Sequence, residues 1–159
     1  MNLLKLSLAL MLALLLSACK IELTSEEEEK DKDGQEIVEY IFYKNDVVET
    51  IYPTNLEYDL SIMGGGNSLE IEGDVRNLMI TKDDNIIEMV EVDEIELLTI
   101  SADRTIIDAT DIFVGEIKIA GYENIITVAS CDHLLLAGSG NLVLSIKDGE
   151  CGVVELLIE

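Results

Sequence analysis

The 159-residue chain contains no tryptophan, two phenylalanines, one proline and one histidine, and it carries only ten basic side chains against 33 acidic ones. The scarcity of aromatic rings weakens the case for a surface that stacks on sugars. The formal net charge of −23 argues against binding of nucleic acid or anionic lipid through the protein surface. An acidic excess of this size remains compatible with bound cations, basic partners or simple solubility.

The N-terminal residues predict export. Lys5 precedes an unbroken apolar run over residues 8–16, which is too short for a stable membrane span and matches the charged-then-apolar layout of a secretory signal. The run ends in the motif "LSAC" at 16–19, which resembles the lipobox of bacterial lipoproteins. That resemblance implies removal of residues 1–18 as a lipoprotein signal peptide and attachment of lipid to Cys19.

Lipid on Cys19 would hold the protein in the cell envelope, because several acyl chains anchor a protein stably. Gram-negative lipoproteins that stay in the inner membrane often carry aspartate after the lipidated cysteine, and this chain has Lys20 there. In a Gram-negative cell we therefore expect the outer membrane, facing the periplasm or the cell surface. The alternative is a plain secreted protein in which Cys19 is incidental.

Two short segments precede the main domain. Residues 19–35 are predicted to be the lipidated N-terminus and a disordered acidic tether, because "SEEEEKDKDGQE" at 25–36 has almost no apolar side chain. Residues 36–57 are predicted to be capping strands, since "EIVEYIFY" and "VVETIY" alternate and are rich in β-branched and aromatic residues. This pattern is compatible with two strands or a hairpin, and Pro53 marks the exit.

The remaining residues, 58–159, repeat. Five successive segments place a polar pivot residue five positions after an apolar one, and successive pivots are separated by 18, 20, 19 and 17 residues. The pivots are Asn67, Asn85, Thr105, Asn124 and Asn141. Two positions after them stand Leu69, Ile87, Ile107, Ile126 and Val143. This recurrence is typical of a β-solenoid, in which coils stacked ~4.8 Å apart share one apolar interior.

The predicted fold class is therefore all-β: a short parallel β-helix, or β-solenoid, of about five coils with an N-terminal strand or hairpin cap. Segments such as "GSGN" at 138–141 are then corners, where glycine permits positive φ and asparagine best tolerates a left-handed backbone. A phosphate-binding loop would need lysine and serine or threonine after the glycines and a helix behind them. Neither "GGGNSLEI" nor "GSGNLVLSI" provides them.

The "GSGN-x-V" turn at 138–143, preceded by the strand "CDHLLL", resembles a family of small exported bacterial proteins of unknown function that carry repeated Gly-Ser-Gly-Asn coils. The resemblance covers roughly residues 58–159. It implies a β-solenoid fold and export, and it brings no catalytic residues to transfer. A looser similarity is to the head domains of adhesins, which also stack short β-coils.

The two remaining cysteines, Cys131 and Cys151, fall at the same position of adjacent coils in this alignment. Stacked Cα atoms would lie about 5 Å apart, within the range that a disulfide accepts. An exported protein also meets an oxidising compartment. The alternative is a pair of buried thiols that pack as small apolar side chains.

Three acidic residues, Glu70, Glu88 and Asp108, stand three positions after successive pivots and are expected to point outward from neighbouring strands. Like charges that face each other on adjacent strands repel. Solvent, a nearby cation such as Arg76 or Lys82, or bound Ca²⁺ would relieve that repulsion. The sequence favours a solvated face and leaves a Ca²⁺ site as the alternative.

The last segment, "GVVELLIE" at 152–159, has no further coil to cover it, so the C-terminal coil is a candidate for self-association or for pairing with a partner. We expect a non-enzymatic, membrane-anchored envelope lipoprotein whose acidic solenoid binds or spaces an envelope protein or polysaccharide. The alternative is a small Ca²⁺-dependent polysaccharide lyase, by analogy with larger β-helices. Such an enzyme would need the three acidic residues and Lys82 or Arg104 on one face.

Overall fold

A computed structural model describes residues 34, 37–53, 56–146, 151 and 153–157. The described part of the chain is built from strands, turns and bends, without a helix. The strands are β1 (Val38–Phe42), β2 (Val48–Ile51), β3 (Tyr58–Ile62), β4 (Ser68–Glu72), β5 (Val75–Ile80), β6 (Ile86–Val90), β7 (Glu94–Ile100), β8 (Ile106–Ala120), β9 (Ile125–Ala137), β10 (Leu142–Ser145) and β11 (Val153–Leu157).

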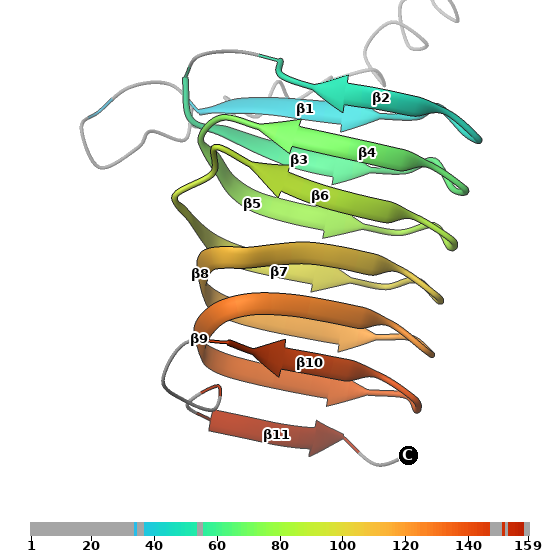
Figure 1. Cartoon of the computed structure of the whole chain (residues 1–159), viewed down its shortest axis with the longest axis vertical. Helices are drawn as coiled ribbons and strands as arrows, with labels where there is room; N and C mark the ends of the chain where they lie inside the picture. The colour runs from blue at the N-terminus through green and yellow to red at the C-terminus, as the bar shows by residue number, and fades with distance from the viewer. Residues whose placement is uncertain (1–33, 35–36, 54–55, 147–150, 152, 158–159) are drawn as a thin grey trace, which may run out of the picture.

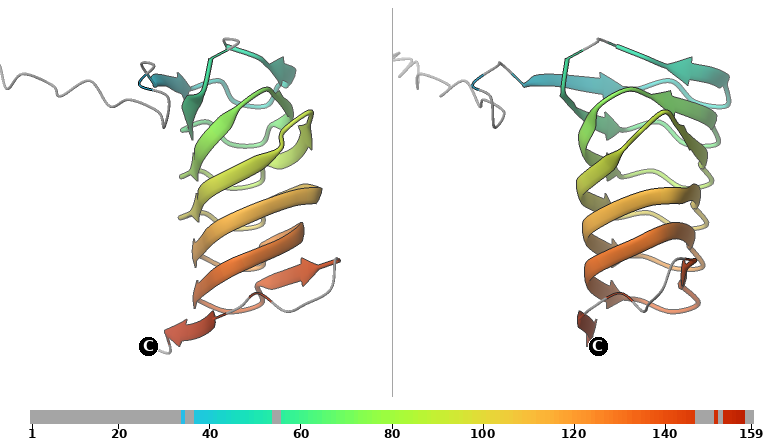
Figure 2. Two further views of the ribbon diagram at one scale, coloured as in Figure 1. Left: turned by 90° about the vertical axis from the view of Figure 1, so that its left-hand side faces the viewer. Right: turned by 60° about the vertical axis from the view of Figure 1, so that its left-hand side comes forward.

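These strands wind into a parallel β-solenoid, which confirms the predicted fold class (Figure 1). On one side of the coil β1, β3, β5 and β7 pair in parallel, and on the other side β2, β4 and β6 do so. The long strands β8 and β9 bend in the middle, so that each contributes to both sides. β10 and β11 complete the two sides at the C-terminal end, and Figure 2 shows the coils stacked along the long axis.

The strands expected to cap the solenoid are its first coil. β1 pairs in parallel with β3, with Val38 opposite Tyr58, and β2 pairs in parallel with β4, with Val48 opposite Ser68. Of the two alternatives, the segment therefore forms two separate strands. This coil explains why the structure has about six turns where five repeats and a cap were expected.

The interior is built from side chains that occupy the same position in successive coils, which we call stacks. The residues two positions after the pivots form one such stack, as predicted, because the strand register places each opposite the next. Its members are Leu69, Ile87, Ile107, Ile126 and Val143, and the first four are almost completely buried. The opposite sheet supplies Leu60, Leu78, Leu98, Ile117 and Leu134 in the same way. Each coil thus covers the apolar face of its neighbour.

Tyr58 occupies an inward position of β3 and is fully buried. Its hydroxyl donates to the carbonyl oxygen of Glu72 at 2.6 Å, so the phenol has a partner inside the core. Burial raises the pKa of Tyr58 above its ordinary value, and the carboxylates of Asp74 and Glu72 raise it further.

A charged pair lies on the first coil of the solenoid. Glu49 lies directly above Leu69, at the position where the other coils carry an apolar side chain. Its carboxylate accepts from the Lys44 ammonium group at 2.7 Å, and that ammonium lies 5.9 Å from the centre of the Phe42 ring. Charged side chains in the terminal coil of a stacked repeat disfavour aggregation at that end.

The pivot asparagines have a different role from the one predicted. The backbone N–H and side-chain amide of Asn67 both donate to Asn85 Oδ1, at 3.2 and 3.0 Å. Asn124 makes the same two bonds to Asn141 Oδ1, at 3.1 and 3.0 Å. The pivots are therefore an asparagine ladder buried at one corner of the solenoid, because a stacked amide can satisfy the backbone of the neighbouring coil.

The corner glycines Gly66, Gly138 and Gly140 have positive φ, as predicted, whereas the pivot asparagines do not. Positive φ values of 53–73° occur at the residue before each of the five pivots and at Asp46, the equivalent residue of the first coil. Four of these six residues are aspartate, glutamate or arginine instead of glycine. These residues are Asp46, Gly66, Asp84, Arg104, Glu123 and Gly140. Glycine is required three positions before some pivots for another reason. A Cβ atom at Gly64 or Gly121 would collide with the carbonyl oxygen of the coil above.

Thr105 interrupts the asparagine ladder. Its backbone N–H donates to Asn124 Oδ1 at 2.9 Å, but its buried hydroxyl is the one buried side-chain polar atom without a hydrogen-bond partner in the described part of the chain. Asn85, one coil above, bonds instead to the carbonyl oxygens of Gly64 and Lys82.

We expect Thr105→Asn to stabilise the protein by about 1 kcal/mol, because an amide of similar size would accept from Asn85 and remove an unpaired buried hydroxyl. The urea midpoint at constant m-value measures this change. Thr105→Val is the matched control, since it removes the hydroxyl without adding a bond. A Thr105→Asn variant less stable than the wild type would contradict the ladder.

Candidate functional site

The candidate site is the outer face of the sheet formed by β2, β4, β6, β10 and the first halves of β8 and β9. Strand register places Glu70, Glu88 and Asp108 in one outward stack, between Thr50 and Thr127. Glu88 and Asp108 are exposed, and Glu70 is half-buried. These three residues are called the acidic stack below.

The geometry gives the Ca²⁺ alternative no support. Within the described residues, no group of three or more histidine, cysteine, aspartate or glutamate side chains is arranged to hold a metal ion. One acidic oxygen is also engaged locally, because Asp108 Oδ1 accepts from the Thr110 hydroxyl at 2.5 Å and from the Thr110 N–H at 3.2 Å. The solvated face therefore stays the favoured interpretation of the acidic stack, and a Ca²⁺ site stays the alternative.

Two of the basic residues considered from the sequence, Arg76 and Arg104, pair with acidic residues outside the acidic stack. Arg76 belongs to β5 on the opposite sheet, where its guanidinium donates to both carboxylate oxygens of Asp59 at 2.9 and 2.6 Å. Arg104 is held at a turn by two bonds to Asp84, at 2.7 and 3.0 Å. Of the two basic residues named for a lyase, Arg104 is thus engaged at a turn, and Lys82 lies in the turn between β5 and β6.

The same face carries an outward stack of apolar side chains, which the sequence reasoning missed. Ile86, Ile106, Ile125 and Leu142 follow one another in register and have between 39% and 53% of their surface exposed. We call these four residues the apolar stack. The signal was available in the position immediately after each pivot, which is apolar in four of five repeats although alternation points it outward.

Ser68 continues the apolar stack upward, and Val48 lies one coil above it. Because the serine side chain is small, a shallow groove of about 290 Å³ opens between Val48 and Ile86. Glu70 and Glu88 of the acidic stack line the same groove. The face therefore combines an apolar ridge, a row of carboxylates and a groove that both of them border.

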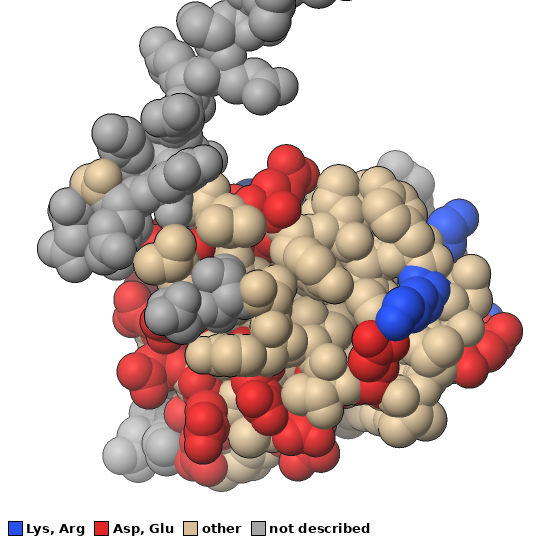
Figure 3. All heavy atoms as spheres, turned by 90° about the horizontal axis from the view of Figure 1, so that it is seen from above, with Lys and Arg blue, Asp and Glu red and all other residues tan. Residues whose placement is uncertain are grey.

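Charge is distributed unevenly around the coil. Figure 3, seen from the N-terminal end, shows acidic side chains gathered along one side, and basic side chains together with other acidic ones on the opposite side. The turn segments 72–75, 90–94 and 109–113 contain six acidic residues and no lysine or arginine. At the pivot turns, the hydrogen bonds from Arg104 lower the pKa of Asp84 and raise that of Arg104 itself.

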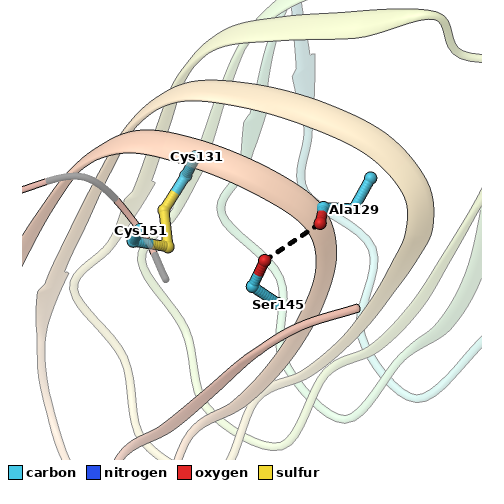
Figure 4. Close-up of a disulfide and its surroundings, with 4 residues drawn as sticks. All are labelled: Ala129, Cys131, Ser145 and Cys151. Carbon is cyan, nitrogen blue, oxygen red and sulfur yellow. Dashed lines mark hydrogen bonds between the residues drawn. A yellow bond between two sulfur atoms is a disulfide. The ribbon is translucent and has the colours of Figure 1, made fainter. Parts of the chain in front are cut away.

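The structure joins Cys131 and Cys151 through their sulfur atoms, with the two Cα atoms 4.6 Å apart (Figure 4). Cys131 lies in the bent part of β9, below Val114, and Cys151 precedes β11. Both residues are buried. On the neighbouring strand, Ser145 Oγ donates to the carbonyl oxygen of Ala129 at 2.9 Å, so a side-chain hydrogen bond also links β10 to the coil above.

Several predictions lie outside the described residues, namely the signal peptide at 1–18, lipidation of Cys19 and, apart from residue 34, the tether at 19–35. No helix in the described ranges is long and apolar enough to cross a membrane.

The fold and the face together define an acidic parallel β-solenoid with one amphipathic sheet surface. Comparison of the chain with protein-family models, with curated proteins and with solved structures finds no match.

Proposed function

We propose that the protein is a non-enzymatic lipoprotein of the cell envelope, anchored through Cys19, whose acidic solenoid binds or spaces a partner. The observation that carries the binding role is the apolar stack, because four large apolar side chains in a row stay exposed on a chain with a net charge of −23. Contiguous exposed apolar surface on a soluble domain is typical of an interaction site.

The spacing role is supported by the chain that precedes the solenoid. Nineteen residue steps separate Cys19 from Val38, the first residue of β1. A fully extended chain spans at most about 3.6 Å per residue, so the upper limit of the distance between anchor and solenoid is about 68 Å. The partner is an envelope protein or a polysaccharide, and self-association through the C-terminal coil is a further proposal. In a Gram-negative cell the location is the outer membrane.

Labelling of the full chain in a bacterial host with a radioactive fatty acid tests the anchor. We expect Cys19→Ser to lose essentially all of the label and to leave the membrane fraction, since only the thiol of Cys19 carries the diacylglycerol. Cys131→Ser is the matched control and should keep both the label and the membrane location. Label that persists in Cys19→Ser would refute the anchor.

A further inference from the structure

We propose that the outer face of β4, β6, β8, β9 and β10 docks a cationic amphipathic helix, with a lysine side chain of the helix in the groove at Ser68. The inference deepens the binding half of the proposed function and does not depend on the lipid anchor. It rests on three features of this face, which are the apolar stack, the acidic stack and the groove.

The apolar stack supplies the ridge on which the apolar side of such a helix would lie. Adjacent members are one coil apart, and strands in a sheet are spaced ~4.8 Å. The pitch of an α-helix is about 5.4 Å. A helix lying along the solenoid axis therefore presents one side chain per turn to each coil, and over the three steps from Ile86 to Leu142 the mismatch sums to only about 2 Å.

The acidic stack supplies the charge complementarity. Glu88 and Asp108 lie two residues along the strand from Ile86 and Ile106, at a separation of about 7 Å. A helix whose apolar stripe covers the apolar stack would therefore place its flanking side chains over the carboxylates. Lysine or arginine at those flanking positions is favoured there, and aspartate or glutamate is disfavoured.

The groove supplies the specific contact. Val48 and Ile86 border it with apolar surface, and Glu70 and Glu88 line it with carboxylates. A lysine side chain has the matching chemistry, because its aliphatic stem packs on apolar surface while its ammonium group remains with the charges. The groove exists because Ser68 is the one small residue in an otherwise apolar stack.

Net charge makes two other occupants unfavourable. A second copy of the chain would bring another formal charge of −23 to this face, and an anionic lipid surface would also be repelled. The same negative charge attracts a basic partner.

Binding of synthetic peptides tests the inference. The protein used begins at residue 20, because the buried core cluster is drawn from residues 42–151, and circular dichroism checks that each variant is folded. The probe is a labelled amphipathic Leu/Lys helix of about 18 residues, or five turns. A Leu/Glu peptide of the same pattern and a scrambled Leu/Lys peptide are the comparators. Fluorescence anisotropy gives the affinity at low and high salt.

We expect the Leu/Lys helix to bind at least about tenfold more tightly than either comparator. Ser68→Ile fills the groove without changing charge and should weaken that binding about tenfold. The double variant Ile106→Ser/Ile125→Ser should weaken binding of the Leu/Lys helix by a similar factor at both salt concentrations. Met79→Ser, on the outer face of the opposite sheet, is the matched control and should change the affinity less than twofold.

Stronger or unchanged binding after Ser68→Ile would overturn the inference, since a purely apolar face gains from an added isoleucine. The inference would also be overturned if Met79→Ser lost as much affinity for the Leu/Lys helix as the variants of the docking face. Equal affinity of the wild type for the Leu/Lys helix and the scrambled peptide, or no binding at all, would overturn it too. So would a dimer that Ile106→Ser/Ile125→Ser dissociates, because a second copy would then occupy the face. Fatty-acid labelling is unaffected by all of these outcomes, so the anchor and the docking face fail separately.

Discussion

Asn124→Asp is expected to destabilise the solenoid by about 4 kcal/mol at neutral pH, because it breaks a buried hydrogen-bond network and buries a charge. Asn124 is completely buried. Its Oδ1 accepts from the Thr105 N–H at 2.9 Å, while its Nδ2 donates to the Ala102 carbonyl at 2.8 Å and to Asn141 Oδ1 at 3.0 Å. Aspartate keeps the acceptor and replaces the donor with a second oxygen that faces two acceptors.

The pH dependence of this variant distinguishes the proposed cause from a simple packing defect. Burial favours the neutral carboxyl and raises the folded-state pKa of an aspartate at 124 above its unfolded value of about 3.9. The stability that protonation contributes is then fully present below about pH 3.9 and is lost as the pH rises through the raised folded-state pKa. The difference between Asn124→Asp and the wild type should therefore shrink as the pH falls from 7 to 4.

Urea unfolding at several pH values measures both effects. Asn141→Asp is the matched control, because Asn141 ends the ladder and is only half-buried. Its Nδ2 donates to the Gly121 and Ala137 carbonyl oxygens at 2.8 and 3.3 Å, so the same chemistry is tested where water has access. We expect Asn141→Asp to lower the free energy of unfolding by about 1–2 kcal/mol. An equal cost at both positions, or a cost at 124 that does not depend on pH, would refute the buried-ladder explanation.

The stacking of the coils could be predicted from the sequence because it follows from two physical requirements. A strand alternates inward and outward side chains, and a coil too small to bury its own apolar face must repeat that alternation at a constant spacing. Leu69, Ile87, Ile107 and Ile126 satisfy both, and the structure places them in one stack.

The role of the pivots could not be predicted in the same way. Asparagine after glycine is compatible with a left-handed backbone and with a buried amide, and the choice depends on which residue carries the positive φ. Here Asp84, Arg104 and Glu123 carry it although none of them is glycine. The buried amide then becomes visible only when the hydrogen bonds between coils are known.

The candidate site, too, could be predicted from the sequence only in part. The acidic stack follows from spacing alone, since Glu70, Glu88 and Asp108 share one offset from their pivots. The groove does not, because it depends on the size of Ser68 relative to Val48 and Ile86, which are 20 and 18 residues away in sequence. Such a feature is a property of neighbours in space, and single-chain patterns do not reveal it.

Removal of the Cys131–Cys151 disulfide is expected to destabilise the C-terminal end by about 3 kcal/mol. The two cysteines are separated by 20 residues, and closing a loop of that length removes about this much conformational entropy from the unfolded chain. The loop spans the second half of β9 and all of β10, and Cys151 lies immediately before β11. Because repeat coils contact only their neighbours, the loss should be confined mainly to the last strands.

Hydrogen exchange of the mature chain with and without reductant measures this effect strand by strand. We expect amide protection in β11 and the second half of β9 to fall by about 100-fold, which is the exchange equivalent of about 3 kcal/mol. Protection in β4 and β6, several coils away, should change by less than a factor of two. The double variant Cys131→Ala/Cys151→Ala should reproduce the reduced protein and should no longer respond to reductant. Two free thiols in protein isolated from an oxidising envelope, or equal protection of β11 in both forms, would show that parallel pairing with β9 alone holds the C-terminal strand.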